Sequence, residues 1–210
     1  MEKFVLLLEL IGTVAFAVSG AVTALKKQMD VFGVCIMGVT AACGGGAVRD
    51  VLLGRVPPVM FCEPIYALTA VLTSLVTFFL ALRRVAWMRS HLFERLLLVS
   101  DAVGLGVFTA VGVDAAVRTG FAGEGFFTVF LAVLTGVGGG VLRDVMAGDR
   151  PYIFVKHFYA CASLIGALLC RALWDVAGRA GAMLLCLLAV SVLRVLAARY
   201  RWSLPKVPLD

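Results

Sequence analysis

Long apolar runs, separated by short charged stretches, occupy most of this 210-residue chain. A transmembrane α-helix needs about 20 mostly apolar residues to cross the hydrocarbon core of a bilayer. The runs that meet this requirement span residues 4–25, 31–52, 64–82, 92–113, 125–146, 152–176 and 179–198. They predict an all-α, polytopic membrane protein with seven transmembrane helices.

The composition excludes other classes of protein. Hydrophobic residues make up 62% of the chain and charged residues 15%, whereas about a quarter of the residues in a soluble domain are charged. The six cysteines form no C-x-x-C pair and no cluster with histidine, so the sequence predicts neither a zinc site nor a redox motif. A soluble globular enzyme, a disordered chain and a secreted disulfide scaffold are therefore excluded.

Lysine and arginine are distributed unevenly between the two ends of the apolar runs. If the N-terminus lies outside, 13 of the 19 basic residues fall on the inner face and 6 on the outer face. Membrane proteins keep an excess of Lys and Arg in their cytoplasmic loops. We therefore expect the N-terminus outside, the C-terminus in the cytoplasm and a short cytoplasmic tail at 199–210. The net charge of +6 then reflects membrane orientation, and no nucleic-acid partner is expected.

A motif of the form G-G-G-x-x-R-D-x-x-x-G-x-x-P occurs twice, at 44–57 and 138–151, and the two copies lie 94 residues apart. A weaker match, with a spacing of 92 residues, precedes the motif and aligns Glu9 with Asp101. Because each copy contains three runs, an odd number, the second copy must cross the membrane in the opposite sense, as in the inverted repeats of transporters and channels. The predicted organisation is a three-helix repeat at 4–82, an inverted three-helix repeat at 92–176 and a seventh helix at 179–198.

Each copy of the motif carries three consecutive glycines inside an apolar run. A glycine in a helix interior costs about 1 kcal/mol relative to alanine, so each triplet opposes helix continuity. Broken backbone is tolerated in a membrane only where protein buries it or where it lines a watery cavity. We therefore expect kinked helices whose released carbonyl groups border a path for cations; the alternative is close packing between helices through small residues. The residues concerned are Gly44, Gly45, Gly46, Gly138, Gly139 and Gly140.

An arginine and an aspartate follow each glycine triplet, at or just inside the end of the run. Ionisable groups in membrane spans are functional candidates. Because adjacent residues on a helix do not face each other, each arginine needs another partner, and each repeat has a carboxylate at matching depth. The candidates are Arg49, Asp50, Arg143 and Asp144, and the predicted ion pairs are Glu9–Arg49 and Asp101–Arg143. Whether these groups gate a pathway or brace the kinked helices stays open at this point.

No catalytic arrangement is recognisable in the sequence. There is no credible Ser/His/Asp set, and the first glycine triplet lacks the G-K-[ST] ending of a phosphate-binding loop. We therefore expect neither enzymatic activity nor a metal site.

At the duplicated motif the sequence resembles the trimeric intracellular cation (TRIC) channel family in its bacterial form, a family also described as glycine-transporter-like membrane proteins. The resemblance covers nearly the whole chain, from about Glu9 to the last apolar run. It implies seven helices in a 3+3+1 plan, a location in the bacterial plasma (inner) membrane, and a homotrimer that contacts membrane lipids and has one pore in each protomer. The pore would pass monovalent cations, chiefly potassium and less readily sodium, beside the glycine kinks. No cofactor is implied other than these permeant ions and bound lipids.

Two hypotheses from different functional classes follow. The leading one is a passive, gated, potassium-permeable channel with its pore beside the glycine-kinked second and fifth helices. The alternative is a secondary transporter of glycine or a similar small zwitterion, which would need an acidic residue near the membrane midplane for ion coupling. The acidic candidates all lie nearer one of the faces, which favours the channel. The two copies also differ after the glycines, with Arg55-Val56 against Asp149-Arg150, so the two pore mouths need not be equivalent.

Overall fold

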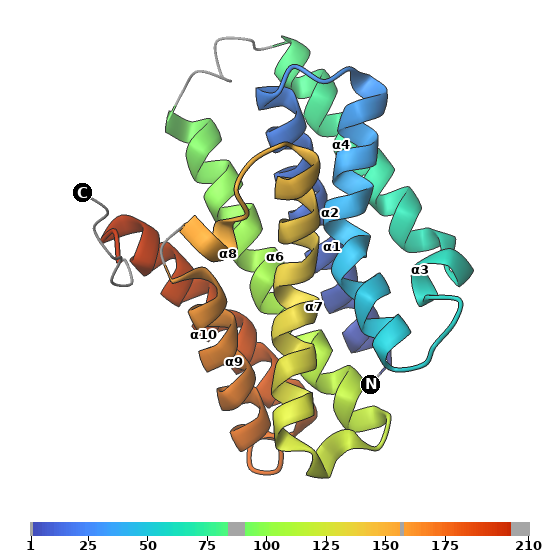
Figure 1. Ribbon diagram of the computed structural model, residues 1–210, viewed down its shortest axis with the longest axis vertical. Helices are drawn as coiled ribbons and strands as arrows, with labels where there is room; N and C mark the ends of the chain where they lie inside the picture. Colours follow the sequence, from blue (N-terminus) through green and yellow to red (C-terminus); the bar gives the residue numbers. More distant parts are fainter. Residues whose placement is uncertain (1, 84–90, 156–157, 203–210) are drawn as a thin grey trace, which may run out of the picture.

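The computed structural model describes residues 2–83, 91–155 and 158–202, and all regular structure in these segments is helical (Figure 1). The helices are α1 (Glu2–Lys26), α2 (Val31–Leu52), α3 (Val59–Cys62), α4 (Pro64–Arg83), α6 (His91–Arg118), η1 (Phe121–Gly123), α7 (Gly125–Met146), α8 (Tyr152–Val155), α9 (Tyr159–Leu173) and α10 (Gly178–Arg199). The absence of strands from the described segments confirms the predicted all-α class. Of the predicted tail, residues 203–210 lie outside the described residues.

Six helices of the described segments, α1, α2, α4, α6, α7 and α10, are long and apolar enough to cross a membrane. α2 and α7 begin and end at the predicted residues. α6 continues to Arg118, past the predicted end at residue 113. The reason is that Asp114, which ends the apolar run, is buried and accepts hydrogen bonds of 2.6 and 2.8 Å from the Arg179 guanidinium of α10. A carboxylate with such a partner can stay inside the helix bundle.

The sixth predicted span, 152–176, is divided in the structure. Its first turn forms α8, and α9 begins only at Tyr159; residues 156–157 lie outside the described residues. Phe158, directly before α9, has a left-handed φ of 53°, which a continuous right-handed helix does not contain. α9 has 15 residues. At 1.5 Å per residue it is about 22 Å long, shorter than the roughly 30 Å hydrocarbon core of a bilayer.

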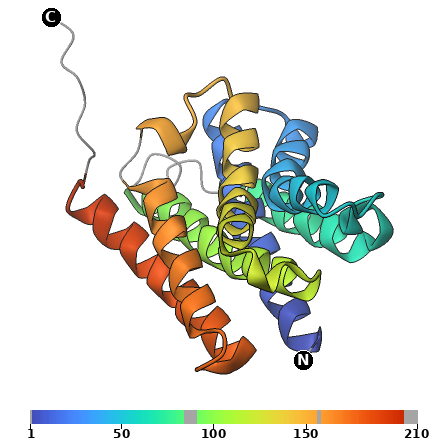
Figure 2. The same ribbon diagram turned by 60° about the horizontal axis from the view of Figure 1, so that its bottom comes forward.

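The helices pack as two groups of three with one helix added. α1, α2 and α4 contact one another, as do α6, α7 and α9, and α10 packs against α6 and α9 (Figures 1 and 2). The two groups meet where α1 contacts α6 and α2 contacts α7. These four helices therefore form the centre of the molecule, while α4 and α10 lie at opposite sides of it.

The two central helices α1 and α6 cross in antiparallel fashion. Gly12 of α1 packs against Val107 of α6, and Phe16, one turn further along α1, packs against Gly104. The two helices therefore run in opposite directions along their contact. The absence of a side chain at Gly104 leaves room for the Phe16 ring, which would otherwise collide with a Cβ atom there.

Candidate functional site

The two glycine triplets lie where α2 crosses α7, also in antiparallel fashion. Each helix runs through its triplet as one continuous α-helix, so the glycines do not end the helix, and the predicted kink stays a prediction. A Cβ atom at Gly45 would collide with the Thr135 carbonyl oxygen, one at Gly139 would collide with the Ala41 carbonyl oxygen, and Gly138 packs against Gly45. The missing side chains let the two backbones touch, and this packing offsets the low helix propensity of glycine.

Gly46 is the triplet residue with open space beside it. The nearest atom that an added Cβ would meet there is Arg49 Nη2, 3.9 Å away. At the matching position in α7, a Cβ on Gly140 would lie 2.8 Å from the Tyr159 hydroxyl, and Gly44 packs against a leucine side chain of α7. The six glycines therefore divide into five at close contacts and one that faces a cavity.

The first charged cluster lies beside the C-terminal end of α2. Arg49 Nε donates a 2.9 Å hydrogen bond to the adjacent Asp50 Oδ1, and Arg49 Nη1 lies 3.7 Å from Glu9 Oε1 on α1. Glu9 Oε2 accepts a 2.6 Å hydrogen bond from the Tyr66 hydroxyl of α4. Asp50 Oδ2 accepts a 3.0 Å hydrogen bond from the Val59 backbone N–H at the start of α3. Arg49 and Asp50 are buried, whereas the Glu9 side chain is 17% exposed.

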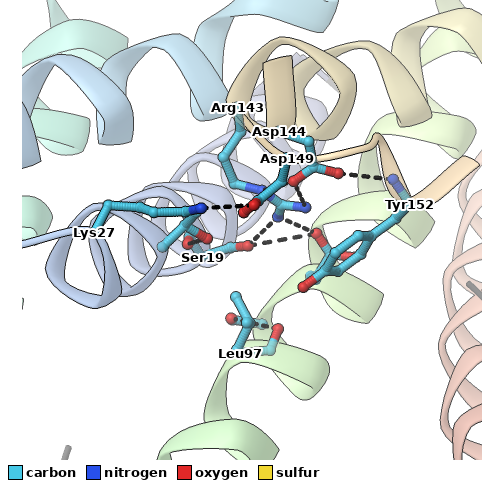
Figure 3. A network of polar contacts seen from close by, with 10 residues as sticks. Ser19, Lys27, Leu97, Arg143, Asp144, Asp149 and Tyr152 are labelled. Atoms are coloured by element: carbon cyan, nitrogen blue, oxygen red, sulfur yellow. Dashed lines mark hydrogen bonds and ion pairs between the residues drawn. The ribbon is translucent and has the colours of Figure 1, made fainter. Parts of the chain in front are cut away.

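The second charged cluster is built in the same way beside the C-terminal end of α7 (Figure 3). Arg143 Nε donates a 2.9 Å hydrogen bond to the adjacent Asp144 Oδ1, and Arg143 Nη1 lies 2.5 Å from Asp101 Oδ1 on α6. The same Nη1 also donates to the Ser19 hydroxyl of α1. Asp144 Oδ2 accepts a 2.8 Å hydrogen bond from the Tyr152 backbone N–H at the start of α8. Arg143 has no exposed surface, so these contacts hold its charge inside the protein.

Both predicted contacts between an arginine and a carboxylate at matching depth are present in the structure. The expectation that an arginine would not reach its adjacent aspartate is wrong for Arg49 and for Arg143. Each side chain folds back along the end of its helix, so that Nε meets the carboxylate of the next residue. That carboxylate then binds the first backbone N–H of the following short helix. Each cluster therefore ties a helix end to the loop that follows it.

Each cluster also contains a tyrosine that was not predicted from the sequence. Tyr66 and Tyr159 lie 93 residues apart, on the helices that follow α3 and α8. The two copies of the motif lie 94 residues apart, and a spacing of 93 residues after Pro57 aligns the two tyrosines. Extending the alignment of the copies with this spacing would have identified them. The two tyrosines differ in their contacts, because Tyr66 binds Glu9, whereas the Tyr159 hydroxyl and Asp101 Oδ2 are buried without a hydrogen-bond partner among the described residues.

Three cavities follow the central helices, and we name them by the part of α1 that lines each one, counted from its N-terminus, which is at the lower end in Figure 1. The lower cavity, of about 170 Å³, is lined by residues that include Glu9, Arg49, Arg55, Asp114 and Arg118. The middle cavity, of about 30 Å³, is lined by residues that include Glu9, Thr13, Cys43, Gly46, Arg49 and Phe108. The upper cavity, of about 250 Å³, is lined by residues that include Lys26, Glu94, Asp101, Tyr152 and Arg194. Glu9 and Arg49 line both the lower and the middle cavity, so their contact lies between the two.

Aromatic and ionic contacts lie between the middle and the upper cavity. Along α6, Phe108 lines the middle cavity, Gly104 packs against Phe16, and Asp101 lines the upper cavity. The Phe16 and Phe108 rings stack with their centroids 5.5 Å apart. Beyond them, Arg143 is held against Asp101. One aromatic contact and one buried ion pair thus lie between the cavities that charged residues line.

Known proteins match nearly the whole chain. A family model described as "Glycine transporter" matches residues 6–82 and 98–175, which fall within the two predicted repeats. The UPF0126 inner membrane protein YadS of Escherichia coli (strain K12) is 36% identical over 205 residues, which cover 97% of this chain and 96% of that protein.

Two solved structures are similar to this one over almost their full length. The first is the TRIC trimeric intracellular cation channel orthologue from Rhodobacter sphaeroides, with 33% identity, a TM-score of 0.85, and coverage of 94% of this chain and 98% of that chain. The second is a prokaryotic TRIC channel in 0.5 M KCl, with 30% identity, a TM-score of 0.87, and coverage of 97% of this chain and 100% of that chain.

Proposed function

Since the chain belongs to the TRIC cation channel family, whose sequence model is described as "Glycine transporter", we propose that it is a gated channel for monovalent cations, chiefly potassium. Its six long apolar helices among the described residues make it a multi-pass membrane protein. Solved relatives are described as channels, and we assign no enzymatic activity to this chain. Cations would pass down their electrochemical gradient through a pore inside each protomer.

The observation that carries this proposal is the pair of charged clusters at opposite ends of the central helices. Each cluster sets a carboxylate, Glu9 or Asp101, against a buried arginine, and each of these carboxylates lines a cavity. Taking a charge out of water costs several kcal/mol per ion, and charged residues inside membrane spans mark ion pathways. Carboxylate oxygens on a pore wall attract cations and disfavour anions. Two such clusters in series are therefore well suited to cation passage.

The proposed path runs from the lower cavity past Glu9 and Arg49 into the middle cavity beside Gly46, and then past the Phe16–Phe108 stack to Asp101 and the upper cavity. We place the gate at the Asp101–Arg143 contact, which is shorter and more deeply buried than the Glu9–Arg49 contact. When Arg143 turns away from Asp101, a cation can take its place beside the carboxylate. Asp144, which holds Arg143 Nε, would keep the displaced guanidinium close to the wall.

The glycine crossing would serve as the pivot for this movement. α2 and α7 touch through their backbones at Gly45, Gly138 and Gly139, without the interlocking side chains that fix most helix pairs. Rotation of one helix against the other therefore displaces few side chains. Gly44 and Gly140 leave room at the flanks of the crossing, and Gly46 exposes helix backbone to the middle cavity.

We further propose two inverted three-helix repeats, at 4–82 and 92–176, and a seventh helix at 179–198. In this plan α8 and α9 together make the sixth crossing. The matching architecture of the two clusters and the antiparallel crossings of α1 with α6 and of α2 with α7 support the plan. The 13 of 19 basic residues that the sequence assigns to the inner face favour an outer N-terminus and a cytoplasmic C-terminus. We propose a homotrimer embedded in membrane lipid, as the Rhodobacter sphaeroides relative is described as trimeric.

Single-channel recording of the purified protein in planar bilayers tests this function. We expect unitary current steps in potassium chloride and smaller steps when sodium replaces potassium. Electrically silent protein that accumulates labelled glycine in vesicles would contradict the channel and would support a glycine transporter instead. Protein-free bilayers and vesicles prepared in parallel control for leak.

A further inference from the structure

One charged side chain in the lower cavity lacks a partner. The other charged groups that line this cavity are ion-paired: Glu9 with Arg49, Asp114 with Arg179, and Arg118 with Glu2. Arg55 lines the same cavity, and its guanidinium forms no hydrogen bond or ion pair with any described residue. The lower mouth of the proposed path therefore carries one positive charge that no contact neutralises.

A tight turn fixes the position of this arginine. Gly54 has a left-handed φ of 71°, and the Arg55 backbone N–H donates a 2.8 Å hydrogen bond to the carbonyl oxygen five residues earlier. The matching turn, 94 residues later, has a φ of 70° at Gly148 and a 2.9 Å hydrogen bond from the Asp149 backbone N–H to the carbonyl oxygen five residues earlier. Residues 55 and 149 thus occupy equivalent places at opposite ends of the central helices.

The charge at these equivalent places differs. Asp149 Oδ1 lies 2.6 Å from Lys27 Nζ, so the upper end carries a neutral ion pair (Figure 3). Thr119, which matches Lys27 at the 92-residue spacing, is uncharged. At these two equivalent positions, the lower end therefore has Arg55 without an ion pair to any described residue, and the upper end has Asp149 in an ion pair with Lys27.

We propose that Arg55 hinders the entry of cations through the lower end at low salt. This inference rests on the proposed channel function. A unit charge about 8 Å from a cation in water lowers the local cation concentration about twofold, and the effect grows beside the low-dielectric walls of a cavity. Salt screens the charge, because the Debye length falls from about 30 Å at 0.01 M to about 3 Å at 1 M.

Single-channel currents at both polarities test the proposal, in bilayers of zwitterionic lipid so that lipid charge adds nothing. With about 20 mM potassium chloride on both sides, we expect Arg55→Gln to raise the current about twofold at the polarity that drives cations in from the lower end, and so to change the ratio of the currents at the two polarities. This difference from the wild-type protein should vanish in about 1 M salt, where screening is nearly complete. Arg55→Lys should keep the wild-type ratio.

Arg171→Gln is the matched control. Arg171 lies at the same end, on α9, where it pairs with Asp175 and donates to the Ala122 carbonyl oxygen, and it does not line the lower cavity. Arg171→Gln removes the same charge from the same end, and we expect it to keep the wild-type ratio of the currents. An Arg55→Gln channel that keeps the wild-type ratio, or an Arg171→Gln channel that changes it equally, would overturn this inference and leave the channel function intact. A wild-type protein without unitary currents would overturn the channel function and this inference with it.

Discussion

Gly139 of α7 packs against the backbone carbonyl oxygen of Ala41 in α2, so the two helices touch without side chains between them. A Cβ atom at residue 139 would collide with this oxygen. We therefore expect Gly139→Ala to lower the free energy of unfolding by about 1–3 kcal/mol, the usual cost of overpacking. Thermal unfolding of the purified protein in detergent measures the change.

The matched control for this substitution is Gly46→Ala. Gly46 is also in a glycine triplet inside a helix, but it faces open space. Alanine is favoured over glycine in helices by about 1 kcal/mol, so this variant should be as stable as the wild-type protein or slightly more stable. Equal destabilisation by the two substitutions would contradict the backbone contact.

Asp101→Asn should be far more destabilising than Glu9→Gln. Asp101 holds the fully buried Arg143, and breaking a buried ion pair typically costs about 3–5 kcal/mol. Glu9 is 17% exposed and lies 3.7 Å from Arg49, and Arg49 keeps its hydrogen bond to Asp50 when Glu9 is replaced. The loss should therefore be about 1 kcal/mol, as for one weakened hydrogen bond. Urea unfolding of both variants in the same detergent makes the comparison. If the two variants lose similar free energies of unfolding, the deeper burial of the Asp101–Arg143 pair does not make it the stronger contact, and the prediction is wrong.

The two tyrosines should respond differently to removal of their hydroxyl groups. Tyr66→Phe removes the hydrogen bond to Glu9 and should cost about 1 kcal/mol. Tyr159→Phe removes a buried hydroxyl without a hydrogen-bond partner among the described residues, so it should leave stability unchanged or raise it. The measurement is the unfolding midpoint of each variant, and a larger loss for Tyr159→Phe would mean that its hydroxyl has a partner.

The helix bounds were largely predictable, because the length of an apolar run encodes a membrane crossing directly. α2 and α7 begin and end where the sequence predicts. The ion pairs of Glu9 with Arg49 and of Asp101 with Arg143 could also be predicted, since a charge inside a span needs a partner at its own depth. The division of the sixth span could not, because it depends on backbone conformation at Phe158 rather than on hydrophobicity.

The glycine triplets show what local reasoning omits. Helix propensity alone opposes a continuous helix through Gly44–Gly46, yet α2 is unbroken there. Close packing of α7 against α2 offsets the low helix propensity of the glycines. The sequence alone does not show that Gly45 faces the backbone of Thr135. The turn that follows α2 could not be predicted for a similar reason. The Val59 backbone N–H donates its hydrogen bond to Asp50 Oδ2 across a loop, and no local pattern indicates this contact.

Chemical labelling of Cys62 tests the proposed orientation. Cys62 ends α3, which follows the lower, C-terminal end of α2 (Figure 1), and is exposed, whereas Cys43, Cys170 and Cys186 are buried. If the lower end faces outside, a membrane-impermeant maleimide should label intact cells through Cys62, and Cys62→Ser should abolish most of this labelling. Labelling that appears only after the cells are lysed would reverse the orientation.

The central claim, that cations cross the protein through the middle cavity, is tested most directly at Gly46, which lines that cavity and has open space beside it. The measurement is the unitary current in potassium chloride for wild-type protein and for Gly46→Leu, with thermal unfolding in detergent to show that the variant is folded. We predict that the added side chain fills the cavity and abolishes most of the current. If folded Gly46→Leu protein conducts like the wild type, cations do not pass through this cavity.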